Sequence, residues 1–150
     1  MSAFRIRPAR LDERAALEAL QLAASLMWES DRAAILANLD SCVIPTVQFE
    51  EGFVFVAERE GVVLGLGVLL PRADGEAELD GLFTHPDHWG KGVGRALIAE
   101  AERRARLWSA PRLNVVGNPN AEGFYTACGF EGFGVEETLF GDGLRLRKAL

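Results

Sequence analysis

The sequence predicts an α+β fold in one domain, residues 1–150, and three observations lead to this prediction. Two neighbouring runs, "FVFVAERE" and "GVVLGLGVLLP", are rich in β-branched and aromatic residues and meet at Gly61, which is typical of a β-hairpin. Further on, Leu97, Ile98 and Ala101 follow a glycine-rich stretch at helical spacing. No repeat, low-complexity segment or linker interrupts the chain, and 150 residues with 49% hydrophobic content are enough to form one core.

Short elements make up the predicted N-terminal part. "FRIRPA" alternates apolar and basic residues and predicts a strand that ends at Pro8. Asp12 is placed to cap a helix whose apolar residues share one face. Ser30 or Asp31 is placed to cap a second, shorter helix, "SDRAAILANLD". Residues 41–52 show no clean period and predict a loop.

The part of the chain after the central hairpin predicts strands that alternate with helices. "AELDGLFTHP" predicts a strand that stops at Pro86, and "RLNVV" predicts another. "NAEGFYTACGF" predicts a short helix that ends at Gly129. The last segment, "ETLFGDGLRLRKAL", predicts a hairpin that turns at Asp142 and Gly143.

Charge and hydropathy exclude several classes of partner. The net charge of −6 argues against a nucleic-acid-binding surface, which normally needs a basic patch. The apolar run "GVVLGLGVLL" is too short to cross a bilayer, which takes about 20 residues. The first residues lack the apolar segment of a secretion signal, so we expect a cytoplasmic protein without a membrane partner.

The cysteines and histidines indicate a reducing compartment and give no sign of a metal site. Cys42 and Cys128 are far apart and lack CxxC spacing, as in proteins of a reducing compartment. His85 and His88 are the only histidines and have no cysteine near them, which favours loop histidines over a metal site. We therefore expect no metal.

The segment "GKGVG" predicts an anion-binding turn. Gly90, Gly92 and Gly94 lie between a predicted strand and a predicted helix, where backbone N–H groups without Cβ atoms can surround a pyrophosphate. A Walker loop requires Ser or Thr after its lysine, but Gly92 follows Lys91. The GxGxxG dinucleotide fingerprint has a different spacing. A purely structural turn is the remaining alternative, because glycines alone are weak evidence.

Two motifs resemble those of the GNAT superfamily of N-acetyltransferases. "LFTHPDHWGKGVGRALI" resembles its acetyl-CoA-binding motif, a strand and a proline followed by Gln/Arg-x-x-Gly-x-Gly/Ala at the start of a helix. Gly92 and Gly94 match the small positions, whereas Trp89 departs from Gln or Arg. "NPNAEGFYTACGF" resembles the later motif through Asn118, Ala121, Phe124, Tyr125, Gly129 and Phe130. The two motifs occur in the family's order.

The resemblance implies a GNAT-like fold and a place for acetyl-CoA. The fold has a mixed central sheet flanked by helices, in which residues 77–85 and 112–116 splay apart and admit the cofactor. Backbone groups of Leu82, Phe83 and Thr84 are then expected to pair with the pantetheine arm. The N–H groups of Gly90 to Arg95 are expected to bind the pyrophosphate. The remaining expected cofactor residues are Trp89, Gly90, Lys91, Gly92, Val93, Gly94, Arg95, Asn118 and Tyr125.

The implied activity is direct transfer of the acetyl group of acetyl-CoA to a primary amine of a small molecule or polypeptide. In the resemblance, Tyr125 is the residue that donates a proton to the leaving thiolate. The alternative interpretation is that Tyr125 is only an aromatic residue of the core. The oxyanion donor is expected to be a backbone N–H near Phe83 or Thr84. The second hypothesis is a non-catalytic acyl-CoA-binding sensor or interaction module, and a homodimer is one further possibility.

The general base is expected on the strand before the glycines. Period-two alternation places Glu78 and Asp80 on one strand face. Leu82 and Thr84 are expected on that same face. Either carboxylate can serve as base, and either can equally be a solvated edge charge. Topology further suggests that Glu136, Glu137 and Trp28 line the acceptor mouth.

Overall fold

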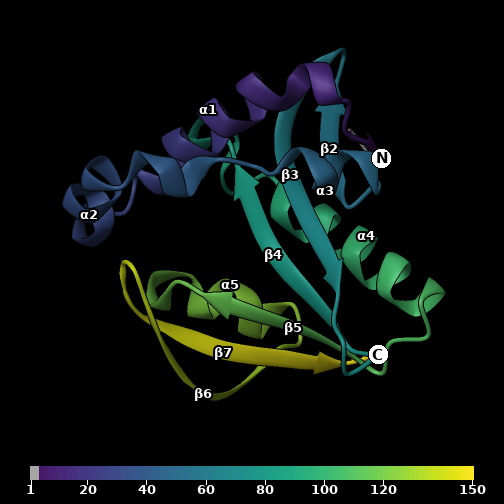
Figure 1. The fold of residues 1–150 in the computed structure, drawn as a ribbon. Coiled ribbons are helices and arrows are strands. Elements are labelled where there is room, and N and C mark those ends of the chain that lie inside the picture. Colours follow the sequence, from purple (N-terminus) through teal and green to yellow (C-terminus); the bar gives the residue numbers. More distant parts are fainter. Residues whose placement is uncertain (1–3) are drawn as a thin grey trace.

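The structure is a computed structural model that describes residues 4–150, so residues 1–3 of the predicted domain lie outside the described part. Seven strands form one sheet in the order β1-β2-β3-β4-β5-β7-β6 (Figure 1). The strands are β1 (Arg5–Pro8), β2 (Val54–Arg59), β3 (Val62–Pro71), β4 (Ala77–Thr84), β5 (Arg112–Gly117), β6 (Glu131–Thr138) and β7 (Gly141–Ala149). The α+β prediction is confirmed.

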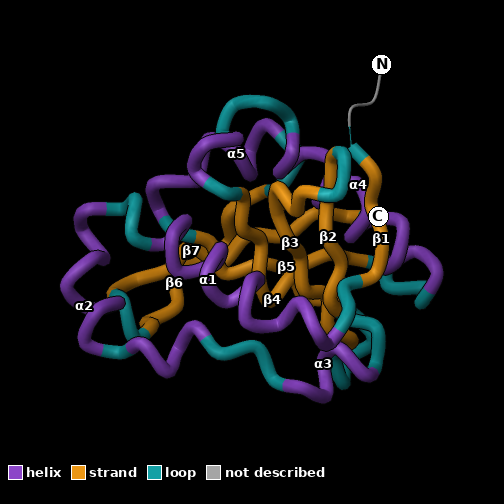
Figure 2. The backbone as a smooth tube through the Cα atoms, turned by 90° about the horizontal axis from the view of Figure 1, so that it is seen from above, coloured by secondary structure: helices purple, strands orange, loops and turns teal. Residues whose placement is uncertain are grey.

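Helices cover both faces of this sheet, as the view from above shows (Figure 2). One face carries α1 (Arg14–Ser25) and α3 (Thr46–Glu50), with α2 (Arg32–Ala37) projecting beyond the end of α1, and the other carries α4 (Val93–Leu107) and α5 (Glu122–Ala127). Each face has its own apolar core because side chains alternate along the strands. In β2, Val54 and Val56 pack towards α1, whereas Phe55 and Ala57 pack towards α4.

The two central strands β4 and β5 pair for only three residues. They form the one parallel pair of the sheet between residues 4 and 150, and it runs from Ala77 opposite Leu113 to Leu79 opposite Val115. Beyond Leu79, β4 continues to Thr84 without a partner on this side. The predicted splay is therefore present, and it leaves one edge of β4 open in the middle of the sheet.

A β-bulge changes which face the β4 side chains occupy. Val68 of β3 lies opposite Gly81 and Leu69 opposite Leu79, so Asp80 is the extra residue. Leu82 consequently packs in the α4 core together with Leu79. The expectation that Leu82 and Thr84 share a face with Glu78 and Asp80 is therefore wrong, because strict alternation does not survive a bulge.

The contacts of Thr84 show that it also faces α4. Its Oγ1 lies 3.8 Å from the position of a Cβ built on Gly94, in the first turn of α4. Phe83, in contrast, packs in the α1 core. Leu82 and Thr84 thus face α4, and Phe83 faces α1 on the opposite side of the sheet.

Some local predictions in the N-terminal part are wrong. Residues 41–52 contain α3 rather than only a loop, since Phe49 supplies a buried anchor that periodicity over so short a segment does not reveal. The carboxylate of Glu13, not Asp12, accepts the Arg10 N–H at 2.8 Å before α1. Asp31 does occupy the N-cap position of α2, as one of the two predicted alternatives, but it makes no capping hydrogen bond because its carboxylate accepts from Asn118.

The terminal hairpin turns three residues earlier than predicted. Leu139 and Phe140 connect β6 to β7, and Gly141 takes a φ of 100°. The Thr138 hydroxyl fixes this turn, accepting the Phe140 N–H at 3.1 Å and donating to the Gly141 carbonyl at 2.6 Å. Asp142 therefore belongs to β7 rather than to the turn itself.

Candidate functional site

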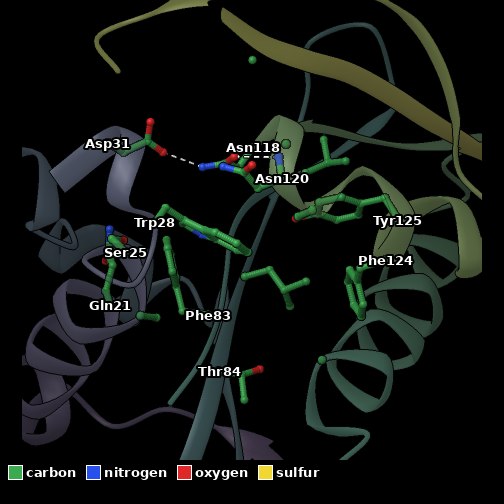
Figure 3. Close-up of a pocket in the computed structure, with 18 of the residues that line it drawn as sticks. Gln21, Ser25, Trp28, Asp31, Phe83, Thr84, Asn118, Asn120, Phe124 and Tyr125 are labelled. Atoms are coloured by element: carbon green, nitrogen blue, oxygen red, sulfur yellow. Dashed lines mark hydrogen bonds between the residues drawn. The ribbon is translucent and has the colours of Figure 1, made fainter. Parts of the chain in front are cut away.

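The splay between β4 and β5 opens into a cleft of about 940 Å³ (Figure 3). Its walls come from β4 and the start of α4 on one side and from the end of β5 and α5 on the other. The end of α1 with the segment before α2, and the β6–β7 turn, close the remaining sides. Segments from the whole length of the chain thus meet at one cavity.

The start of α4 presents free backbone donors to this cleft. Gly92 is the N-cap residue, with a φ of 85°, and no side chain caps the helix. The first turn also contains no acidic residue. The first N–H groups of a helix of this length therefore lack protein acceptors, which makes a site for an anion.

The three glycines serve two different purposes. Gly90 and Gly92 both have positive φ, at 76° and 85°, and a Cβ on either would project into open space. Gly94 instead permits close packing, since its Cβ would lie 3.0 Å from the Phe124 ring. The first two glycines shape an empty cradle, and the third brings α5 against the start of α4.

The hydrogen-bond ladder decides which β4 backbone groups face the splay. The His85 N–H donates to the Leu64 carbonyl at 2.8 Å, which identifies a hydrogen-bonded pair between β3 and the end of β4. Antiparallel pairs alternate, so the backbone groups of Phe83 also face β3. Those of Leu82 and Thr84 face away from β3, into the splay. Phe83 is thus not available as a backbone donor to a ligand in the gap.

Trp89 joins the glycine turn to both sides of the cleft. Its Nε1–H donates to the Thr84 carbonyl at 2.7 Å. Its ring lies against Trp28, with centroids 5.3 Å apart and planes inclined by 31°. The tryptophan at the position where the motif has Gln or Arg therefore still hydrogen-bonds to the backbone, and it adds a contact with the segment after α1.

Both polar atoms of the Asn118 amide make hydrogen bonds within the protein. Its Oδ1 accepts the Asn120 N–H at 2.9 Å, and its Nδ2 donates to Oδ2 of Asp31 at 2.6 Å (Figure 3). The first contact shapes the turn between β5 and α5. The second ties that turn to the segment between α1 and α2, across the cleft.

Tyr125 is a buried side chain with a free polar end. Only 7% of the residue is exposed, and its ring makes edge contacts with Phe124 and Phe130. Its hydroxyl points into the cleft (Figure 3) and has no hydrogen-bond partner among residues 4–150. Burial raises the pKa of the phenol to about 12, with a smaller contribution from Cys128, so it stays protonated at neutral pH.

The two β4 carboxylates have different positions. Asp80, at the bulge, lines the cleft; burial raises its pKa, and a hydrogen bond with Gln48 partly opposes this effect. The pKa of Glu78 is also raised, mainly by burial and further by Asp80 and Glu136. Glu78 is not among the residues that line the cleft.

Most of the residues predicted for the site come together in this cleft. Those that line it are Trp28, Asp80, Leu82, Phe83, Thr84, Trp89, Gly90, Gly92, Val93, Gly94, Arg95, Asn118 and Tyr125. Those outside its lining are Glu78, Lys91, Glu136 and Glu137. Asp31 and Asp142 also line the cleft. Neither was predicted there, because local patterns made Asp31 one of two candidates for a helix cap and placed Asp142 in a turn.

Two kinds of feature are absent from residues 4–150, a three-residue metal-ligand group and a membrane-spanning helix. Residues 4–150 contain no group of three or more His, Cys, Asp or Glu side chains that could hold a metal ion. Within the same range, every helix is too short or too polar to span a lipid bilayer.

Known proteins resemble this chain in sequence and in fold. A mycothiol acetyltransferase from Kineococcus radiotolerans is 43% identical over 61 residues, which are 36% of this chain and 20% of that protein. The chain thus matches only about a fifth of that relative's length. A GCN5-related N-acetyltransferase structure from Rhodopseudomonas palustris superposes with a TM-score of 0.82 at 22% identity, covering 100% of this chain and 98% of that one.

A second solved structure carries a ligand. The PaiA N-acetyltransferase from Thermoplasma acidophilum, in complex with coenzyme A, has a TM-score of 0.75 at 20% identity over 100% of both chains. At these identities the two structures show a common fold. The sequence profile of the acetyltransferase (GNAT) family matches residues 16–130, which include the splayed strands, the glycine turn and Tyr125. This chain belongs to the GNAT acetyltransferase family.

Proposed function

We propose that this chain is an N-acetyltransferase that moves the acetyl group of acetyl-CoA to a primary amine. The observation that carries the proposal is the hydroxyl of the buried Tyr125 side chain, which points without a partner among residues 4–150 into the same cleft as the uncapped start of α4. One feature suits an anionic cosubstrate and the other suits proton donation. We further propose that residues 1–150 form one such domain and that it acts in the cytoplasm.

The residues of the cleft fit acetyl-CoA. The uncapped N–H groups from Gly92 to Arg95 would hold the pyrophosphate, and the Arg95 side chain would add positive charge. The outward backbone groups of Leu82 and Thr84 would bind the pantetheine arm as a neighbouring strand would. When bound, acetyl-CoA supplies an activated thioester. The Leu82 N–H and Thr84 N–H become the candidate oxyanion donors in place of Phe83.

The transfer needs one proton acceptor and one proton donor. Asp80 accepts a proton from the ammonium group of the acceptor, because only the neutral amine has a lone pair for attack. The amine nitrogen then forms the C–N bond while the C–S bond breaks. Tyr125 donates its hydroxyl proton to the leaving sulfur, and the resulting phenolate takes up the second proton that the nitrogen must lose to become a neutral amide, either directly or through water. The products are an N-substituted acetamide and coenzyme A.

Replacing Gly92 by valine is expected to weaken acetyl-CoA binding at least tenfold, which corresponds to about 1.4 kcal/mol. The new side chain would enter the open space of the cradle and would strain a φ of 85°. Gly75→Val is the matched control, since Gly75 has the same φ of 85° and open surroundings in the turn before β4. Calorimetry on both folded variants measures the affinity. If Gly92→Val binds acetyl-CoA as tightly as the wild type does, the glycine turn does not bind the pyrophosphate.

Tyr125→Phe is expected to lower kcat by about 100-fold, with KM for acetyl-CoA little changed. Only the hydroxyl is removed, so the ring contacts with Phe124 and Phe130 remain. The measurement is steady-state acetylation of an amine, with thermal unfolding and cofactor affinity as internal controls. Because the phenol pKa is about 12, the wild-type rate should show no loss from this group below about pH 11. Full activity in the variant would remove Tyr125 from the mechanism.

Asp80→Asn is expected to lower kcat and to remove an acidic limb from its pH profile. In the wild type, activity falls as the pH drops through the raised pKa of Asp80, because the protonated carboxyl cannot accept a proton. Glu78→Gln is the control: its pKa is also raised, but it lies outside the cleft lining and should leave that limb in place. The base lies elsewhere if the Asp80→Asn profile matches the wild type.

A further inference from the structure

We propose that the acceptor is a small amine that carries a second positive charge, as a diamine or polyamine does. This inference rests on the acetyl transfer proposed above and concerns the same cleft. The observation behind it is a set of three carboxylates, Asp31, Asp80 and Asp142, which come from distant parts of the chain and line the cleft. Asp80 serves the reacting amine, and the other two would bind the second charge.

The charges that line the cleft are unbalanced. Among the lining residues within 4–150, Arg95 is the only lysine or arginine, and it lies in the first turn of α4 at the cosubstrate end. The walls formed by the segment before α2 and by the β6–β7 hairpin therefore supply carboxylates and no cationic side chain of those types. Their electrostatic potential favours a cation at that end of the cleft.

Asp142 is not neutralised by the protein. Within residues 4–150 its carboxylate makes no ion pair or side-chain hydrogen bond. It lies directly opposite Glu137 in the β6–β7 register, and like charges in such pairs are destabilising. Arg145 of the same hairpin pairs with Glu136 instead, at 3.6 Å. The fold tolerates a repulsive pair beside the cleft that a bound cation would relieve.

Asp31 keeps part of its hydrogen-bonding capacity for a ligand. Oδ2 accepts from Asn118 at 2.6 Å, whereas Oδ1 has only a long contact of 3.5 Å from the Ser30 hydroxyl. Trp28 lines the cleft beside it (Figure 3) and offers an aromatic surface for the alkyl part of an amine. The unpartnered Tyr125 hydroxyl, in a residue only 7% exposed, marks the reacting end of the same cavity.

Two contacts across the cleft favour a small acceptor over a polypeptide. The Trp28 ring lies against Trp89, and Asp31 is hydrogen-bonded to Asn118. Both contacts join the segment after α1 to the cosubstrate side, and so they restrict passage through the cleft at that point. A short alkyl diamine needs less room there than an extended peptide chain.

The test compares 1,4-diaminobutane with butylamine, which has the same chain but one charge. Binding to the complex of protein and coenzyme A is measured by calorimetry, and acetylation is measured separately with acetyl-CoA. We expect the diamine to bind about tenfold more tightly than butylamine, because it makes added charge contacts with the cleft wall. Asp142→Asn should weaken diamine binding about fivefold and leave butylamine unchanged.

Two variants sharpen this comparison. The double variant Asp31→Asn with Asp142→Asn should remove the preference for the diamine, while the amide oxygen at position 31 can still accept from Asn118. Glu131→Gln is the matched control, since it removes one negative charge from exposed β6 outside the cleft lining and should change neither amine.

The outcomes separate the acceptor proposal from the transfer proposal. Equal binding of the two amines, an equal effect of Asp142→Asn on both, or preference for a peptide with a free N-terminus would overturn the acceptor class. Any of these results overturns it even if butylamine is acetylated. Asp142-dependent diamine binding without any acetylation would keep the acceptor class and contradict the transfer function.

Discussion

The site depends on the place where β4 and β5 stop pairing, directly after Leu79 and Val115. A sheet normally satisfies its backbone groups through neighbouring strands, and an interior strand with an open edge must find other partners. Here the open groups belong to Leu82 and Thr84, because those of Phe83 are turned towards β3. The bulge at Asp80 marks the same point and turns a carboxylate towards the resulting cleft.

Small residues allow the aromatic side chains to close around this opening. A Cβ on Gly94 would lie 3.0 Å from the Phe124 ring, and a Cβ on Gly117 would lie 2.8 Å from the ring of Tyr125. Both glycines therefore let α5 approach the start of α4 and the end of β5. This packing holds the phenol in place although α5 itself is short. The position of the Tyr125 side chain thus depends on residues that have no side chain.

Sequence reasoning predicted the elements with a strong period and the two motifs with fixed spacing. It could not predict the bulge at Asp80, since an inserted residue leaves no mark on the composition of "AELDGLFT". The predicted strand faces of Leu82 and Thr84 were wrong for that reason. It offered Asp31 only as one of two candidates for a helix cap, because local rules cannot detect a partner as distant in sequence as Asn118. Contacts between remote segments, rather than local propensity, decided these cases.

The proposed binding of the cosubstrate at the open edge of β4 can be tested at individual backbone amides. The measurement is amide hydrogen exchange followed by NMR, with and without acetyl-CoA. The Phe83 amide should exchange slowly in both states because β3 already holds it, whereas those of Leu82 and Thr84 should become protected only when acetyl-CoA is bound. If acetyl-CoA binds tightly but the amide exchange of Leu82 and Thr84 is unchanged, the cosubstrate does not bind at the open edge of β4.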